Sequence, residues 1–262
     1  SHIFKELIKQ GKKVLCLKER MEDIKSIKQK LECYKPKYFI NAAGLTGVPN
    51  TKWCNTHKIE TLMTNVVSQI NIVNLCNEYN VHCTLIGSGA IFKKSNFQKF
   101  SYHPGDLTAD DEYYSLCRIM LEEQIKPFNN CLLLRVNYPI SSSIVGDINS
   151  KNLIYKILKY EQIEDVKLSV TNLDSLCPLI PKMLKNNVTG VVNFINKGNL
   201  NIANLMRKIE VYYNLTPKKI IKSDRPNTLL ICDKLDNAIY NVEDIDSSVD
   251  ILIPKLNIKL PI

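Results

Sequence analysis

Residues 38–47 read Tyr-Phe-Ile-Asn-Ala-Ala-Gly-Leu-Thr-Gly, a short apolar run that stops abruptly in small residues. Such a run is typical of a buried parallel strand. The small residues let the backbone approach a ligand closely, and Gly44 permits a turn that a β-carbon would obstruct. Because ligands of open α/β sheets bind outside the carboxyl ends of strands, the stretch indicates a nucleotide-type cofactor site. Ordinary tight packing of the same small residues is the alternative.

On either side of this stretch, helical and strand patterns alternate. Strands are predicted at residues 13–18, 38–41, 81–86, 131–136 and 191–195. Helices are predicted at residues 1–10, 21–33, 60–79, 113–125, 151–160, 173–184 and 202–213, followed by a polar tail. This order predicts an α/β fold of Rossmann type, a doubly wound parallel sheet with helices on both faces and right-handed crossovers.

The pattern loosens after Pro139, which suggests two parts. We predict an NAD(P)-binding domain at residues 1–138, with residues 165–195 returning to it. A smaller C-terminal substrate-binding lobe is predicted at residues 139–164 and 196–262.

The first strand and the glycine-rich turn that normally open a dinucleotide fold are missing from the printed sequence. It begins at Ser1, in what reads as the helix after that turn. Truncation and true absence both account for this. We favour truncation, because a sheet without its central first strand would expose two unpaired strand edges.

The composition is that of a soluble globular protein, with 45% hydrophobic and 23% charged residues among 262. No apolar run approaches the roughly 18 residues of a membrane span, so no membrane association is expected. No signal peptide is apparent. Nine cysteines lie mostly within apolar runs, without a repeated C-x-x-C pair. We therefore expect free thiols and a cytoplasmic location.

The net charge of +9 raises the alternative of a nucleic-acid-binding module. The lysines, however, are spread along the chain and are not gathered into one arm or stripe. Lys, Asn and Ile are abundant together, so the charge can follow from compositional bias. It also suits an anionic small-molecule substrate, and no nucleic-acid partner is expected.

A longer motif surrounds the opening stretch and carries a family resemblance. Residues 39–67 read F-I-N-A-A-G-x-T-G-x-P-N-x-x-W-C-x-x-H-K-x-E-T-x-x-x-N-V-V, and weaker blocks follow at residues 135–142, 171–178 and 193–194. The motif resembles extended short-chain dehydrogenase/reductases that make rhamnose. More narrowly, it is similar to the bifunctional UDP-4-keto-6-deoxyglucose 3,5-epimerase/4-reductases, and more distantly to dTDP-4-dehydrorhamnose reductases.

The resemblance implies an activity. This is NAD(P)H-dependent reduction of the 4-keto group of a UDP-linked or dTDP-linked 4-keto-6-deoxy sugar, together with 3,5-epimerisation, giving UDP-L-rhamnose. A homodimer is compatible with it. A non-catalytic or impaired cofactor-binding regulatory protein on the same fold is the alternative.

The same resemblance assigns the reductive chemistry to three side chains. In the family, a Tyr protonates the carbonyl, a Ser or Thr hydrogen-bonds the same oxygen, and a Lys supports the Tyr and holds the nicotinamide ribose. These positions correspond here to Tyr114, Ser88 and Arg118. Arginine at the lysine position keeps the charge but is not a conservative exchange, so a slower enzyme or a changed ribose contact is expected. A solvated helix face is the alternative for Tyr114 and Arg118.

The groups implied for epimerisation match less well. Ala90 stands where these relatives carry a Cys that serves proton transfer at C3 and C5. Lys156 matches the second proton-transfer group after a small insertion, and a surface lysine is its alternative. Cys117 lies one helical turn from Tyr114 and is a candidate substitute for the missing thiol.

Cofactor and substrate contacts follow by position. The cofactor contacts are expected at Arg20, Asp23, Ala42, Ala43, Gly44, Asn65, Tyr114 and Arg118. Arg20 lies where a 2′-phosphate would bind, which favours NADPH, and the adjacent Glu19 leaves NADH open. The substrate contacts are expected at Thr46, Ser88, Asn137 and Arg225, where Arg225 could hold a diphosphate. A surface arginine is the alternative for Arg225.

Two other kinds of site are rejected. Cys54-x-x-His57 has no second pair with metal-ligand spacing, so no metal is expected and His57 is interpreted as structural. Ser88 lacks the G-x-S-x-G turn of a hydrolase nucleophile.

Overall fold

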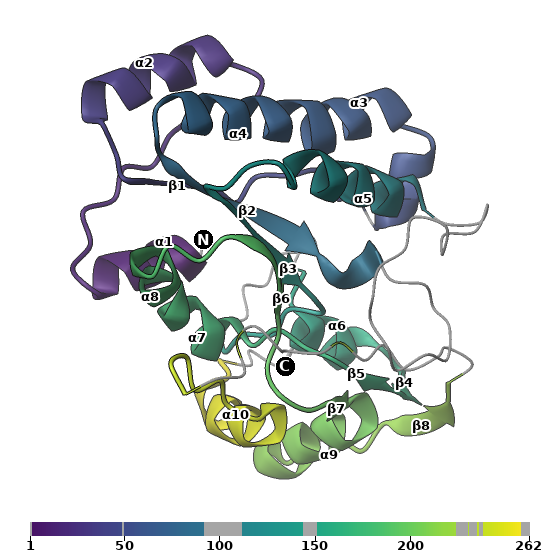
Figure 1. Cartoon of the computed structure of the whole chain (residues 1–262). Coiled ribbons are helices and arrows are strands. Elements are labelled where there is room, and N and C mark those ends of the chain that lie inside the picture. The colour runs from purple at the N-terminus through teal and green to yellow at the C-terminus, as the bar shows by residue number, and fades with distance from the viewer. Residues whose placement is uncertain are drawn as a thin grey trace.

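A four-stranded parallel sheet forms the centre of the protein (Figure 1). The computed structural model describes residues 2–48, 50–91, 112–143, 151–223, 230, 235 and 238–257. The strand order is β1-β2-β3-β6. The strands are β1 (Tyr38–Asn41), β2 (His82–Ser88), β3 (Cys131–Val136) and β6 (Gly190–Phe194). Because all are parallel, their carboxyl ends lie at one edge, and the predicted α/β fold class is confirmed.

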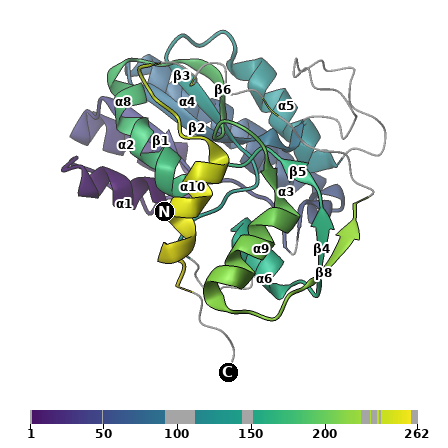
Figure 2. The same cartoon turned by 90° about the horizontal axis from the view of Figure 1, so that it is seen from below.

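Helices cover both faces of this sheet (Figures 1 and 2). One face carries α2 (Ile24–Tyr34), α3 (Lys58–Leu62), the π-helical turn η2 (Met63–Val67), α4 (Ser68–Glu78) and α5 (Tyr113–Ile125). The other carries α1 (His2–Lys9), α7 (Leu173–Leu176), η5 (Cys177–Leu179) and α8 (Ile180–Lys185). Alternation along β3 explains this, because Leu133 packs with Leu121 of α5 and Leu132 packs with Ile180 of α8.

A second group of elements lies below the sheet in Figure 1 and has its own apolar core. Its elements are α6 (Leu153–Lys159), β4 (Gln162–Asp165), β5 (Lys167–Leu168), β7 (Leu200–Asn201), α9 (Ile202–Tyr213), β8 (Lys219–Lys222), α10 (Ile245–Leu252) and η6 (Ile253–Lys255). β4 pairs with β8 in parallel and β5 pairs with β7 in antiparallel. Ile154, Leu205 and Val249 are fully buried at its centre.

Three expectations need correction. Residues 13–18 form no strand, and no described strand pairs with them to complete their backbone hydrogen bonds. The segment expected to be a polar tail contains β8 and α10. Ile245, Val249 and Leu252 are buried on one face of α10. The long helix predicted at residues 60–79 is interrupted by the π-turn η2.

In the described part of the chain, no helix has the length and apolar character needed to cross a membrane.

Candidate active site

Two amide side chains, Asn41 and Gln69, hydrogen-bond the backbone of the loop after β1. Asn41 is buried, and its Nδ2 donates to Oε1 of Gln69 over 2.7 Å. The Ala43 N–H donates to Oδ1 of Asn41 (3.1 Å), and Nε2 of Gln69 donates to the Ala43 carbonyl (3.0 Å). Ala42, Ala43 and Gly44 themselves are exposed. The loop therefore presents its backbone to solvent at the carboxyl edge of the sheet, as the sequence predicted.

Asn65 fixes the next residue of this loop. Its side chain is fully buried, donates to the Leu45 carbonyl (2.7 Å) and accepts from the Leu45 N–H (2.9 Å). Asn65 belongs to the π-turn η2, and such turns occur frequently at functional sites. The extra residue of the turn brings this amide against the loop.

Tyr114 and Arg118 are brought together on α5. Both are buried, with 5% and 4% of their surface exposed, so the solvated-face alternative is wrong. The guanidinium carbon of Arg118 lies 5.1 Å from the centre of the Tyr114 ring. Its Nη1 donates to the Ile86 carbonyl over 3.5 Å, while its Nε has no hydrogen-bond partner. Among the described residues no carboxylate forms an ion pair with it, and a buried charge without a partner is costly.

Gly44 is where the loop meets α5. A β-carbon added there would lie 2.8 Å from Nη2 of Arg118 and 3.4 Å from Oδ1 of Asn65. Glycine is therefore required by this close approach.

Ser88 is the last residue of β2. Its half-buried hydroxyl accepts from the Ala90 N–H over 3.1 Å. Ala90 is exposed in the turn η3 (Gly89–Ile91), and its carbonyl accepts from Oγ of Ser115 over 2.8 Å. The turn is thus tied to α5 one residue after Tyr114.

The predicted substrate contacts differ in their burial and in the residues around them. Thr46 is half-buried in the loop after β1. Asn137 is buried, and its Nδ2 donates to the Ser169 carbonyl over 2.7 Å. The side chain of Asn137 also packs closely on Gly89, because a β-carbon added to Gly89 would lie 2.7 Å from Oδ1 of Asn137. Asn137 therefore supports the turn η3. Arg225 lies outside the described residues.

Lys156 is half-buried on α6. Burial lowers the pKa of its amine, and the nearby charge of Lys151 lowers that pKa further. Nζ of Lys151 reaches the Gly47 carbonyl over 3.4 Å, so the segment before α6 contacts the loop after β1.

Arg20 and Asp23 lie in the segment that leads into α2. The Arg20 side chain is 88% exposed, with its Nε 3.6 Å from a carboxylate oxygen of Glu22. Asp23 caps α2 by accepting from the Ser26 N–H (3.0 Å), and hydrogen bonds from Ser26 lower the pKa of its carboxyl group. Met21 joins this segment to the loop after β1, because Nδ2 of Asn41 donates to its Sδ over 3.1 Å.

Comparisons with known proteins identify the family of this chain. The NAD dependent epimerase/dehydratase family matches residues 1–162. The chain belongs to this family. A bifunctional dTDP-4-dehydrorhamnose 3,5-epimerase/dTDP-4-dehydrorhamnose reductase of Arabidopsis thaliana is 33% identical over 245 residues, covering 88% of this chain and 80% of the relative. A trifunctional UDP-glucose 4,6-dehydratase/3,5-epimerase/UDP-4-keto-L-rhamnose-reductase of the same plant is 30% identical, and there the match spans 36% of the relative.

Solved structures have the same fold. The UDP-rhamnose synthase of Acanthamoeba polyphaga mimivirus superposes with a TM-score of 0.81 and 25% identity over 97% of this chain and 94% of that one. A dTDP-4-dehydrorhamnose reductase of Bacillus anthracis, solved in complex with NADP, gives a TM-score of 0.78 at 14% identity over 97% and 92%. The second likeness concerns the fold alone.

The site fits the nicotinamide cofactor of this epimerase/dehydratase family. Ala42, Ala43 and Gly44 expose their backbone, and position 44 has no room for a β-carbon. The buried Nε of Arg118 lacks a partner within the described chain. An oxygen-rich ligand beside Gly44 would supply that partner. Within the described ranges, no group of three or more His, Cys, Asp or Glu could hold a metal ion.

The packing of Cys117 and His57 bears on the roles that were expected for them. Cys117 is fully buried, and burial raises the pKa of its thiol to about 11. It therefore does not replace a solvent-facing thiol at Ala90. His57 stacks on Trp53 with ring centres 3.6 Å apart, and its Nδ1 lies 3.0 Å from the Trp53 carbonyl oxygen, a structural role.

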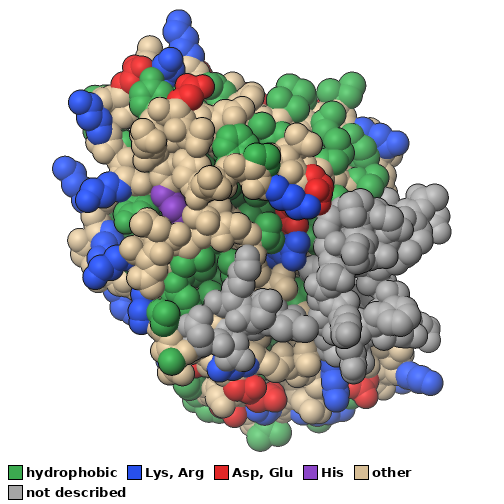
Figure 3. All heavy atoms as spheres, viewed as in Figure 1, with side chains coloured by type: hydrophobic (Ala, Val, Ile, Leu, Met, Phe, Trp, Pro, Cys, Tyr) green, Lys and Arg blue, Asp and Glu red, His purple; other side chains and the backbone are tan. Residues whose placement is uncertain are grey.

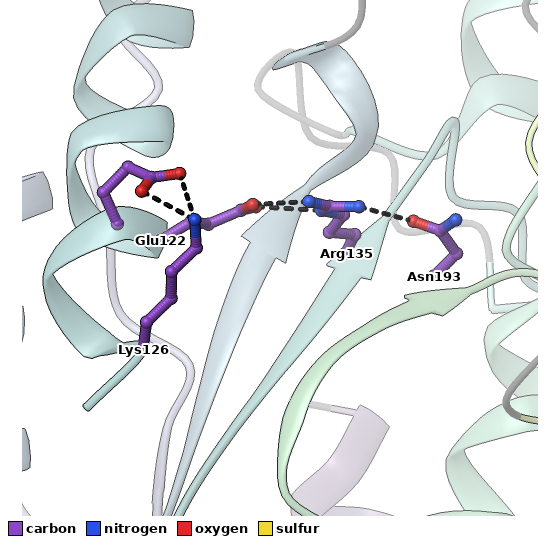
Figure 4. A network of polar contacts seen from close by, with 5 residues as sticks. Glu122, Lys126, Arg135 and Asn193 are labelled. Carbon is purple, nitrogen blue, oxygen red and sulfur yellow. Dashed lines mark hydrogen bonds and ion pairs between the residues drawn. The ribbon is translucent and has the colours of Figure 1, made fainter. Parts of the chain in front are cut away.

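Sequence reasoning missed the buried ion pair that fixes α5 to the sheet (Figure 4). Oε1 and Oε2 of Glu122 accept from Nε (2.9 Å) and Nη2 (2.5 Å) of Arg135 on β3. Nη1 of Arg135 donates to Oδ1 of Asn193 on β6 over 3.2 Å. An arginine within an otherwise apolar strand was the available signal, because a buried charge requires a partner.

Proposed function

We propose that this protein reduces the 4-keto group of a nucleotide-linked 4-keto-6-deoxyhexose with NAD(P)H and also catalyses 3,5-epimerisation, giving UDP-L-rhamnose. The observation that carries the proposal is the buried pair of Tyr114 and Arg118 beside the exposed Ala42–Gly44 backbone. The activities named for the Arabidopsis and mimivirus relatives support it.

The chain's own residues have distinct tasks in this proposal. The bound cofactor supplies hydride to the carbonyl carbon. Tyr114 donates the proton that the carbonyl oxygen takes up, and Ser88 hydrogen-bonds the same oxygen. Arg118, next to Gly44, would hold the nicotinamide ribose, and its guanidinium keeps positive charge at the Tyr114 ring. Asn65 and Gln69 hold the loop in shape.

We propose that residues 1–138 and 165–195 bind the cofactor, and that residues 139–164 and 196–262 bind the sugar nucleotide. Arg20, exposed beside Asp23, is proposed to meet a 2′-phosphate, which makes NADPH the preferred reductant. The eight cysteines that the structure describes are free thiols, as is typical of the cytoplasm, where we place the reaction.

The direct test supplies UDP-4-keto-6-deoxyglucose and NADPH to the full chain and follows cofactor absorbance and the sugar product. We expect NADPH oxidation in step with product formation. The dTDP-linked sugar and NADH, tested in parallel, define the preferred nucleotide and reductant. Absence of oxidation with all four pairs would contradict the proposal.

Lys156 is proposed to transfer protons at C3 and C5. Because Lys151 lowers the pKa of Lys156, Lys151→Met should raise that pKa. The limb of the epimerisation pH profile set by Lys156 should therefore move to higher pH in Lys151→Met, and Lys156→Met should lose solvent-deuterium incorporation at C3 and C5. NMR of the sugar in D2O measures both. An unmoved profile with Lys156→Met still active would remove Lys156 from the mechanism.

We propose a homodimer through the outer face of α3, η2 and α5. Three apolar side chains are exposed there, Ile59 (78%), Met63 (45%) and Met120 (45%). Apolar side chains gather over α3 and α5 in the upper right of Figure 3. Ile59→Glu should convert a dimeric mass in light scattering to a monomeric one. Val211→Glu, at an apolar residue on α9 that is 83% exposed, is the matched control and should leave the mass unchanged.

A further inference from the structure

The short helix η1 (Thr51–Asn55) contacts two parts of the candidate site, the loop after β1 and the start of α5. On one side, Trp53 packs against Gly47 in the loop after β1. Gly47 has φ +68°, and a β-carbon there would lie 2.7 Å from Cβ of Trp53. On the other side, Oδ1 of Asn55 accepts a hydrogen bond from the Tyr113 N–H over 2.8 Å.

The contact with Tyr113 matters because of how α5 begins. The first backbone N–H groups of a helix have no partner within the helix and need an acceptor from elsewhere. Glu112, the residue at the N-cap, makes no side-chain capping hydrogen bond. Its carboxylate accepts instead from the Thr51 hydroxyl. Asn55, which is 58 residues away in the sequence, supplies the acceptor for the first residue of α5.

Further contacts hold the same turn of the helix. Nζ of Lys58 lies 5.5 Å from the centre of the Tyr113 ring. Cys54 of η1 and Cys117, which is one turn along α5, are both fully buried. The start of α5 is therefore attached to η1 by the hydrogen bonds Tyr113–Asn55 and Glu112–Thr51, immediately before Tyr114.

We infer that Asn55 is a positioning residue for the reduction, acting through the Tyr113 N–H on the placement of Tyr114. The inference rests on the proposed role of Tyr114 as proton donor. A shift of the first turn of α5 would move the Tyr114 hydroxyl relative to Ser88, which is attached to the sheet. A displacement of about 1 Å can lower a catalytic rate on the order of 10²-fold.

The test compares Asn55→Ala and Asn55→Asp in the full chain, using NADPH and the 4-keto sugar nucleotide. Asn55 is exposed, so both variants should fold. We expect Asn55→Ala to lower kcat by about 10- to 100-fold. KM for the sugar and Kd for NADPH should stay close to the unmodified values. Asn55→Asp keeps an acceptor at the positive end of the helix and should restore most of kcat.

Asp244→Ala is the matched control. Asp244 caps α10 by accepting from the Asp246 N–H over 2.9 Å, and α10 carries none of the candidate site residues. Its loss should lower the melting temperature about as much as Asn55→Ala does, without changing kcat. A deuterium isotope effect with labelled NADPH should increase in Asn55→Ala, because misplacement slows the chemical step.

Two outcomes separate this inference from the proposed function. If Asn55→Ala keeps the kcat of Asp244→Ala while Tyr114→Phe is inactive, the inference is overturned and the function stands. If the unmodified protein oxidises no NADPH in the presence of the 4-keto sugar nucleotide, the proposed function itself fails, and the role of Asn55 fails with it.

Discussion

Tyr114→Phe should lower kcat for 4-keto reduction by about 10²- to 10⁴-fold, the usual contribution of a positioned general acid. The exchange removes only the hydroxyl, so the buried ring and its contact with the Arg118 guanidinium remain. Cofactor affinity and melting temperature should change little. Single-turnover oxidation of bound NADPH measures the chemical step directly.

Tyr113→Phe is the neighbouring control. It keeps the backbone N–H that donates to Asn55 and removes only the side-chain hydroxyl. We expect it to retain most of the activity. Loss of reduction in Tyr113→Phe with full activity in Tyr114→Phe would show that the proton donor is misassigned by one residue.

Glu122→Gln should destabilise the protein by about 3–5 kcal/mol, the usual cost of breaking a buried ion pair from one side. Glu122 and Arg135 have side chains only 3% and 12% exposed, so water cannot replace the lost carboxylate. Because the pair attaches α5 to β3, the same variant should loosen the helix that carries Tyr114. Urea unfolding at neutral pH measures the change in free energy of unfolding.

Glu123→Gln provides the comparison within the same helix. Glu123 pairs with Lys126 at 2.6 Å, but the two side chains are 34% and 63% exposed. Exposed pairs contribute about 0–1 kcal/mol, so the variant should unfold close to the unmodified protein. Equal destabilisation by Glu122→Gln and Glu123→Gln would mean that burial does not set the strength of the Glu122 pair.

Some elements could be predicted from the sequence to the residue. The strands Tyr38–Asn41 and Cys131–Val136 and the helices Tyr113–Ile125 and Ile202–Tyr213 have the predicted bounds. Each is marked by local signals, an apolar run or an apolar face that ends at a polar residue, a turn or a cap. Such signals are complete within the segment itself.

Other elements depend on partners that are distant in the sequence. β4 and β8 are short, and they become strands by pairing with each other across more than fifty residues. Residues 13–18 have a strand-like composition, but no described strand pairs with them. Strand formation requires a second segment to complete the backbone hydrogen bonds, and local composition does not reveal that segment.

The candidate site divides in the same way. The sequence by itself determined the small-residue strand end at residues 41–44 and the i, i+4 spacing of Tyr114 and Arg118, while the kind of chemistry to expect came from the family resemblance. Only the tertiary structure decided that Arg118 is buried against Gly44, that Cys117 faces away from solvent, and that Asn55 supports the start of α5. Spacing along a helix is a local property, whereas burial and hydrogen-bond partners arise when separate segments pack together and exclude water.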